Sequence, residues 1–346
     1  MSPDFTSIDQ PFSNQISIDG KTYLYFGGTA YLGIPQNREF LELYLKGIKK
    51  YGLNNGTSRS NNIQLGIYND AEQVAAGRFK SESALIISSG YLAAQLAVKT
   101  LSQKGKVLYA PATHPALWLK NQESDSRSFT AWALQTLQLI NTSDEKNWVL
   151  ISNSMNNLFP EIYDFGFLKQ IDQDKKLTLI VDDSHGIGVN NFGRSAYDLL
   201  PQQENIERIV VASMAKALGV DAGLILASKE MINKLKNTNE FNGASPSAAA
   251  GAYAFIHAAE IYQKEWEKLQ QNISFLVDHL DSRWNFAPNF PAFLIHDSEI
   301  DQKLLKQNIL ISSFPYPTQN SKPINRIVLS SWHQEADILK LASAIA

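Results

Sequence analysis

Six short apolar runs recur along the chain, and they constrain the fold more than any other feature of the sequence. Each run carries Ile, Val or Leu on consecutive positions, which is typical of strands covered on both faces of a parallel sheet. Most runs are separated by stretches suited to helices, such as 91–103 and 164–176, and this alternation predicts a mainly parallel α/β sheet. The runs are 84–88, 106–110, 148–152, 177–181, 208–212 and 223–227.

The remainder of the chain indicates an arm and a second, smaller domain. A stretch without proline at 247–280 predicts a long helix, and a short polar helix is expected at about 298–307 among strand-like segments. Near the N-terminus, Asp19–Gly20 predicts a hairpin that could pack on either domain. We therefore expect an arm at 1–35, a large domain at 36–240, and an interdomain helix with a small α+β domain at 241–346.

Composition excludes several classes of function. The chain has 346 residues, no cysteine and only six histidines without an H-x-x-x-H pair, so no metal site is expected. A formal net charge of −3 gives no general attraction for nucleic acid or an acidic membrane surface. No apolar run approaches the roughly 20 residues of a membrane-spanning helix, and the first residues lack the apolar core of a signal peptide. We expect a cytoplasmic protein that binds neither nucleic acid nor membrane.

Polar clusters follow three of the apolar runs. They are "SSGY" at 88–91, "DDSHG" at 182–186 and "SMAKALG" at 213–219. In open parallel sheets, ligands bind outside the carboxyl ends of the strands. The three clusters are therefore predicted to form one site.

Lys216 lies among small and apolar residues in the third cluster. Loss of hydration there would lower the pKa of its amine and leave it a nucleophile. The alternative is a lysine at the start of a surface helix whose ammonium group reaches solvent.

Asp182 ends an apolar run, where a buried carboxylate needs a partner. A protonated pyridine nitrogen is one such partner, and a helix N-cap or a structural ion pair is the alternative. His185 could donate to a cofactor oxygen or to a loop carbonyl. Asp183 is expected to cap a helix or to face solvent.

The other polar and glycine-rich segments are less specific. The turn before Tyr91 could bind phosphate through backbone N–H groups at a helix start. His114 could stack on a planar cofactor or be an ordinary loop histidine. "GGTAYLG" at 27–33 lacks the spacing of a dinucleotide loop. Arg59 could bind an anion or lie in a surface turn.

Taken together, these segments resemble one family in the same order along nearly the whole chain. The sequence resembles the α-oxoamine synthases, pyridoxal 5'-phosphate (PLP) enzymes of the aspartate-aminotransferase-like fold, such as 8-amino-7-oxononanoate synthase. The matching segments are "YGLNNGTSRSNN", "ALIISSGYLAAQLAV", "VDDSHGIGV", "ASMAKALGVDAG" and "INRIVLSSWHQEADI".

The resemblance implies roles around the cofactor ring. Lys216 would bind the PLP aldehyde covalently and later move the substrate's α-proton. Asp182 would pair with the ring nitrogen, and His185 would hydrogen-bond the phenolic oxygen. His114 would stack on the ring face.

The resemblance also implies a phosphate site and a shared dimer. Gly90 and Tyr91 would offer backbone amides to the phosphate, and the Ser213 hydroxyl would assist. Ser245 would reach the phosphate of a neighbouring subunit, because members of the family are homodimers with shared sites.

The implied substrates are an amino acid and an acyl-CoA or acyl-carrier thioester, condensed with decarboxylation to an α-amino ketone. Arg326 would hold the amino-acid carboxylate in a bidentate pair. Asn156 falls where the family has a serine near the cofactor.

Some positions depart from the family pattern, and they bear on acyl transfer more than on PLP binding. Ala30 and Ala94 replace asparagines, and Asn69 replaces a histidine. Ser184 and Ala215 also differ from the usual residues. Two other hypotheses therefore stand beside the acyltransferase: an aminotransferase on the same scaffold, and a non-catalytic protein that kept the fold.

Overall fold

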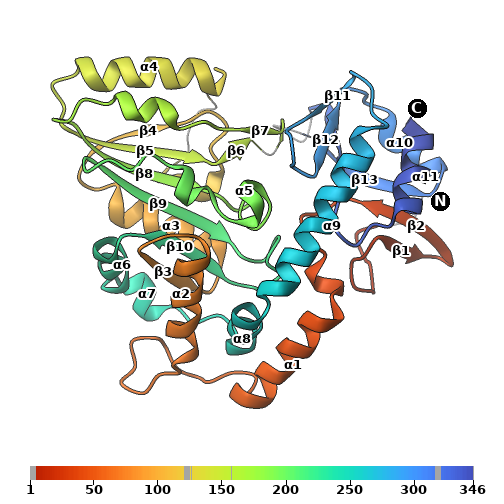
Figure 1. Ribbon diagram of the computed structural model, residues 1–346, viewed down its shortest axis with the longest axis horizontal. Coiled ribbons are helices and arrows are strands. Elements are labelled where there is room, and N and C mark those ends of the chain that lie inside the picture. The colour runs from red at the N-terminus through yellow and green to blue at the C-terminus, as the bar shows by residue number, and fades with distance from the viewer. Residues whose placement is uncertain (1–4, 121–124, 126, 157, 316–320, 346) are drawn as a thin grey trace.

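The chain forms two six-stranded sheets, each with helices packed against it (Figure 1). The structure, a computed structural model, describes residues 5–120, 125, 127–156, 158–315 and 321–345. In the first sheet the strand order is β3 (Ser83–Ile87), β10 (Gly223–Ala227), β9 (Ile206–Ser213), β8 (Lys176–Asp182), β5 (Asn147–Asn153) and β4 (Lys106–Tyr109).

All six apolar runs are strands of this first sheet, which confirms the predicted α/β fold. The pairs β4–β5, β5–β8 and β8–β9 are parallel, and only β10 runs antiparallel to its neighbours β9 and β3. Alternate residues of one strand enter different parts of the core: Ile180 lies in one buried cluster, while Leu179 and Val181 lie in another. Both faces are therefore covered, which is why consecutive positions are apolar.

Helices flank this sheet, and several begin at a side-chain cap. The Ser89 hydroxyl accepts from the Leu92 N–H at the start of α3, and Ser128 and Ser228 cap α4 and α6 in the same way. Between β2 and β11 the α-helices are α1 (Arg38–Tyr51), α2 (Ile67–Arg78), α3 (Gly90–Leu101), α4 (Phe129–Thr142), α5 (Asn190–Gly193), α6 (Lys229–Lys236), α7 (Asn239–Gly243), α8 (Ala249–His257) and α9 (Ala259–Val277). Short 3₁₀ turns are η1 (Ile34–Gln36), η2 (Pro115–Leu117), η3 (Gly166–Gln170) and η4 (Ala196–Leu199), and β6 (Met155–Asn156) pairs with β7 (Glu161–Ile162).

Two helix predictions were wrong in detail. The stretch 164–176 contains only η3, because Phe165, Leu168 and Ile171 are buried at a spacing of three, which suits a 3₁₀ turn. The predicted single helix at 247–280 is two helices, α8 and α9, because Ala258 leaves helical torsion angles (φ −98°, ψ 17°). This break lets α8 pack on α1 and α2 while α9 crosses toward the second sheet and packs on α11 (Figure 1).

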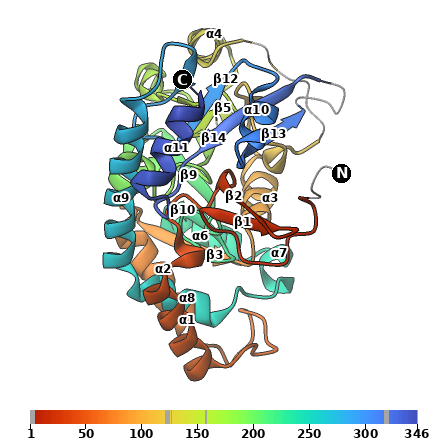
Figure 2. The ribbon, with the colours of Figure 1, turned by 90° about the vertical axis from the view of Figure 1, so that its right-hand side faces the viewer.

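The second sheet combines the N-terminal hairpin with the C-terminal strands (Figure 2). Asp19 and Gly20 form the turn with φ values of 50° and 72°, as a two-residue hairpin loop requires, so the predicted hairpin is confirmed. Parallel pairing of β2 with β13 attaches the arm to this sheet. Its order is β1 (Gln15–Ile18), β2 (Lys21–Phe26), β13 (Ile309–Pro315), β14 (Pro323–Val328), β12 (Ala292–Ile295) and β11 (Trp284–Phe286), with helices α10 (Ile300–Lys306) and α11 (Glu335–Ile345).

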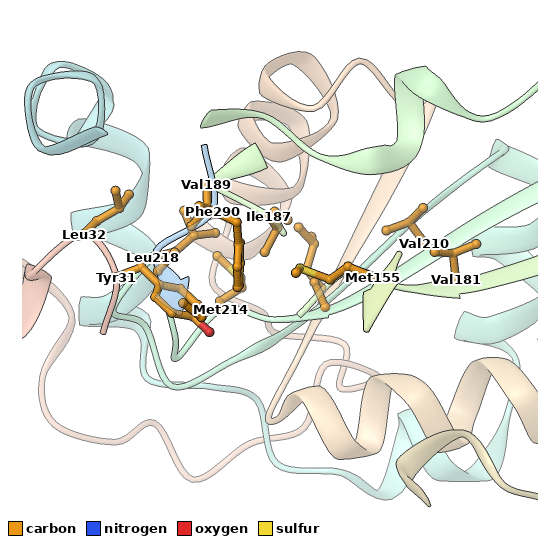
Figure 3. Close-up of a cluster of buried hydrophobic side chains, with 14 of the residues drawn as sticks. Tyr31, Leu32, Met155, Val181, Ile187, Val189, Val210, Met214, Leu218 and Phe290 are labelled. Atoms are coloured by element: carbon orange, nitrogen blue, oxygen red, sulfur yellow. The ribbon is translucent and has the colours of Figure 1, made fainter. Parts of the chain in front are cut away.

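A buried apolar cluster joins the two sheets (Figure 3). Tyr31 and Phe290 lie beside Met214 and Leu218, which follow β9 of the first sheet. The Tyr31 and Phe290 rings meet edge to face, with centroids 5.5 Å apart. The N-terminal segment is therefore packed between the second sheet and the turn that carries Lys216.

Candidate active site

The carboxyl ends of β3, β8 and β9 meet at one cavity of about 180 Å³. Because these strands run in the same direction, the polar clusters that follow them lie at one edge of the sheet. The segment after β4 and the end of β5 with the residues that follow it contribute the remaining wall. The lining residues are Gly90, Tyr91, His114, Ala116, Asn153, Met155, Asp182, Ser184, His185, Ser213 and Lys216.

Lys216 lies in a tight turn after β9. The Met214 N–H donates to the Ala222 carbonyl and the Val220 N–H to the Met214 carbonyl, which closes the turn. Burial lowers the pKa of the Lys216 amine, and the Asp182 carboxylate partly opposes that shift. Lys216 therefore lines the cavity and is not a surface lysine.

Asp182 ends β8 and is partly accessible from the cavity. Its Oδ1 accepts from the Ser184 N–H at 2.8 Å, which fixes the carboxylate over the turn. The Ser184 hydroxyl in turn accepts from the Ser213 N–H at 2.8 Å. One chain of hydrogen bonds thus ties the end of β8 to the end of β9, beside Lys216.

His185 and Tyr31 are 2.7 Å apart, from His185 Nδ1 to the Tyr31 hydroxyl. Burial lowers the pKa of His185 well below its ordinary value, and the charges of Lys216 and Arg326 lower it further. Burial raises the pKa of Tyr31 to about 12, against the influence of Arg326. The segment 27–33, which lacks the spacing of a dinucleotide loop, brings Tyr31 to the site. No feature of the sequence singled out this tyrosine.

His114 is the N-cap residue of η2 and lines the cavity. Its N–H donates to Asn153 Oδ1 at 3.1 Å, and Asn153 Nδ2 donates to the Ala112 carbonyl at 2.7 Å. His114 Nδ1 accepts from the Ala116 N–H at 3.1 Å. Asn153, the last residue of β5, is a site residue that the sequence interpretation missed.

Gly90 and Ser213 approach each other closely at the start of α3. A Cβ added to Gly90 would lie 2.6 Å from Ser213 Cβ and 2.7 Å from Ser213 Cα. Only glycine fits at this distance, so α3 begins directly against the end of β9. Tyr91, the next residue, is 65% exposed and borders the opening.

Three residues named from the sequence do not line this cavity. Asn156 Oδ1 accepts from the N–H groups of Leu158 and Phe159, so this side chain caps a turn. Ser245 is exposed on a different surface, beside the segment 53–58. Arg326 is buried in β14 of the second sheet, where its charge acts on Tyr31 and His185.

The surroundings of Asp183 and Arg59 differ in part from what the sequence predicts. Asp183 is buried and does not face solvent; its Oδ2 accepts from the N–H of Ala196, the first residue of η4, at 2.8 Å, and burial raises its pKa to about 7. Arg59 lies in a turn, as one alternative predicted, but its side chain is buried and already paired with a carboxylate. It forms a buried ion pair with Glu72, whose Oε1 also accepts from the Ile86 N–H.

Within the described ranges, no helix is both long and apolar enough to cross a membrane. No group of three or more His, Asp or Glu side chains in the same part of the chain could hold a metal ion.

Comparison with known proteins places the chain in a family. The aminotransferase class I and II model matches residues 41–345. The 8-amino-7-oxononanoate synthase of Thermosipho melanesiensis is 21% identical, with 96% of this chain and 90% of that protein covered. The synthase of that name from Nitrosomonas europaea is 23% identical, with 98% and 92% covered.

Among solved structures, a serine palmitoyltransferase from S. paucimobilis with bound PLP is similar, with a TM-score of 0.80 at 17% identity. The superposition covers 98% of this chain and 90% of that one, and at this identity it shows the shared fold. The chain therefore belongs to the aminotransferase class I and II family of PLP-dependent transferases, and its sequence is similar to the 8-amino-7-oxononanoate synthases.

Proposed function

We propose that this protein condenses an amino acid with an acyl-CoA or acyl-carrier thioester, releasing carbon dioxide and a free thiol and forming an α-amino ketone. The carrying observation is that Lys216, Asp182, His114 and His185 line one cavity at the carboxyl ends of parallel strands. The 8-amino-7-oxononanoate synthases among the relatives support this reaction type.

The residues present fit PLP. The close approach of Gly90 to Ser213 leaves the start of α3 without a side chain over the cavity edge, where backbone N–H groups can face an anion. An amine, a carboxylate and two imidazoles lie around the remaining wall. PLP needs this combination, since it carries an aldehyde, a basic ring nitrogen and a phenolic oxygen.

Lys216 is the residue that holds the cofactor and moves a proton. Because burial lowers the pKa of its amine, more of the amine is neutral near pH 7 and can act as a nucleophile or a base. When bound, PLP supplies an electron sink that stabilises negative charge on the substrate's α-carbon. Lys216 Nζ takes the α-proton and later returns one.

Three side chains orient the ring. Asp182 supplies the negative charge for the ring nitrogen, and its bond from the Ser184 N–H keeps it directed. His185 donates to the phenolic oxygen. His114, whose backbone N–H donates to Asn153 Oδ1, would stack on the ring face.

The phosphate and the partner subunit complete the proposed site. Gly90 and Tyr91 offer N–H groups and Ser213 offers its hydroxyl. Ser245 is exposed and lies away from its own chain's cavity, which supports a role in the site of a second copy in a homodimer. Exposed apolar side chains at Leu53 and Ile63 add surface for such an interface. Analytical ultracentrifugation tests the dimer, and a monomer at micromolar concentration would contradict it.

Arg326 is proposed to hold the substrate carboxylate. Its guanidinium is buried at the second sheet and acts electrostatically on both Tyr31 and His185, so it is near the cavity. Three of the five departures from the family pattern have a local explanation: Asn69 accepts from Arg59, Ala94 is buried within α3, and the Ala30 carbonyl accepts from Ser330. Each is accommodated by local packing or hydrogen bonding.

The first experiment tests covalent binding. Protein loaded with PLP is reduced with borohydride and mapped by peptide mass spectrometry, and we expect the label on Lys216. Lys175 is an internal control, because it is buried but its amine donates to the carbonyls of Ser143 and Glu145. Unlabelled Lys216 would refute the proposal.

The second experiment separates the possible activities. The enzyme is mixed with L-alanine and pimeloyl-CoA, and free thiol and carbon dioxide are measured. Release of both without an added oxo acid supports the acyltransferase. Conversion of bound PLP to its pyridoxamine form, dependent on an oxo acid, would instead indicate transamination. No spectral change with any amino acid would indicate a non-catalytic protein.

A further inference from the structure

We propose that Tyr31 is a positioning residue that fixes the tautomer of His185, with Nδ1 as acceptor and the proton on Nε2, facing the cavity. The tautomer follows from the contact between the two side chains. Its consequence for the phenolic oxygen of PLP rests on the proposed function.

The hydrogen bond between the two side chains satisfies both groups in only one direction, with the Tyr31 hydroxyl as donor. Tyr31 is 1% exposed, and its hydroxyl lies 2.7 Å from His185 Nδ1. In the described part of the chain, the Tyr31 hydroxyl forms its hydrogen bond with that nitrogen. A phenol has one proton to donate. If His185 Nδ1–H donated to the hydroxyl instead, the proton of the buried tyrosine would have no acceptor among those residues.

The surroundings of the two groups favour their neutral forms, and a neutral imidazole has a choice between two tautomers. Burial raises the pKa of Tyr31 to about 12. Burial lowers the pKa of His185, and the positive charges of Lys216 and Arg326 act in the same direction. A neutral imidazole carries a single N–H, and the partner of one nitrogen decides which nitrogen has it.

The tyrosine is held from the opposite side by the second sheet. Its carbonyl accepts from the Ser331 N–H at 2.9 Å, and its ring packs on Phe290 (Figure 3). Gly33 continues the segment with a φ of 58°, and a Cβ there would lie 2.8 Å from the Ser331 hydroxyl. These contacts hold the backbone and the ring of Tyr31 in place beside His185.

The consequence is a donor at the cavity. With Nδ1 occupied, His185 Nε2–H is directed to a ligand oxygen, which is the role that the proposed function needs. In the other tautomer Nε2 would present a lone pair to that oxygen and repel it.

The test uses nitrogen-15 NMR of the full chain with labelled histidine and without PLP. Six histidines give few signals, and His185→Gln identifies the one of interest. We expect Nδ1 of His185 to be of the unprotonated type and Nε2 of the protonated type. In Tyr31→Phe we expect this pattern to be lost or mixed and the affinity for PLP to fall about three- to tenfold, as for one lost neutral hydrogen bond.

The matched control is Tyr262→Phe. Tyr262 is fully buried and its hydroxyl also donates at 2.7 Å, but to the Leu218 carbonyl. This control should leave the His185 signals in place. A protonated Nδ1 in the unmodified protein, or an unchanged pattern in Tyr31→Phe, would overturn the inference. If Tyr31→Phe failed to fold, the spectrum of the unmodified protein would still decide. Borohydride labelling of Lys216 tests the proposed function separately.

Discussion

Gly90→Ala should destabilise the protein and weaken PLP binding, although the same substitution at Gly77 should stabilise it. Both glycines are in helices and neither has a positive φ. At Gly77, near the end of α2, an added Cβ would have no heavy atom within 4 Å. At Gly90 it would lie 2.6 Å from Ser213 Cβ and 2.7 Å from Ser213 Cα, so a helix start and a strand end must move apart.

The magnitudes follow from these distances. Alanine in an open helical position gains about 0.5–1 kcal/mol over glycine, since the unfolded chain loses less conformational freedom. Forcing a methyl group into a packed contact costs about 1–3 kcal/mol. The free energies of unfolding of the two variants should therefore differ by about 1.5–4 kcal/mol. PLP affinity should fall about tenfold or more in Gly90→Ala only, because the N–H groups at the start of α3 are displaced.

Urea unfolding of the PLP-free protein measures the first quantity, and PLP titration followed by absorbance measures the second. Equal unfolding midpoints and equal PLP affinities in the two variants would refute the packing argument. A loss of affinity in Gly77→Ala would show that the effect is not local to the cavity.

Three further substitutions test buried polar groups, and a fourth, at an exposed ion pair, is their control. The pKa of Asp183 is raised from 3.8 to about 7, so the folded state keeps a proton that the unfolded chain releases. Between about pH 4 and pH 7 the free energy of unfolding should therefore fall as pH rises, by on the order of 2–4 kcal/mol. Asp183→Asn should remove this pH dependence in urea titrations. Ser184→Ala takes away the acceptor of the Ser213 N–H and should lower the free energy of unfolding by about 1–3 kcal/mol. A change near zero would show that this hydrogen bond does not stabilise the fold. Glu72→Gln should cost about 3–5 kcal/mol, because Arg59 and Lys236 both pair with this buried carboxylate. Asp174→Asn in the exposed pair with Lys146 should change stability little, and equal losses in these last two variants would contradict the role of burial.

The sequence alone determined the class of fold and most of the candidate site. Strands buried on both faces need apolar side chains on consecutive positions, and that local requirement is visible in all six runs. Parallel strands end at one edge, so the polar residues after them, Asp182 and Lys216 above all, had to converge. The glycine of the turn before α3, Gly90, was visible in the sequence as well, although the contact with Ser213 that requires a glycine there was not.

Only the tertiary structure decided which distant groups meet at the cavity. Tyr31 and His185 are 154 positions apart, and nothing local to either residue specifies the contact. The break at Ala258 and the burial of Asp183 and Arg59 depend likewise on what packs against them from other segments. Sequence periodicity reports the interactions of a residue with its own element, whereas a contact between two elements depends on how both are placed by the packing of the whole chain.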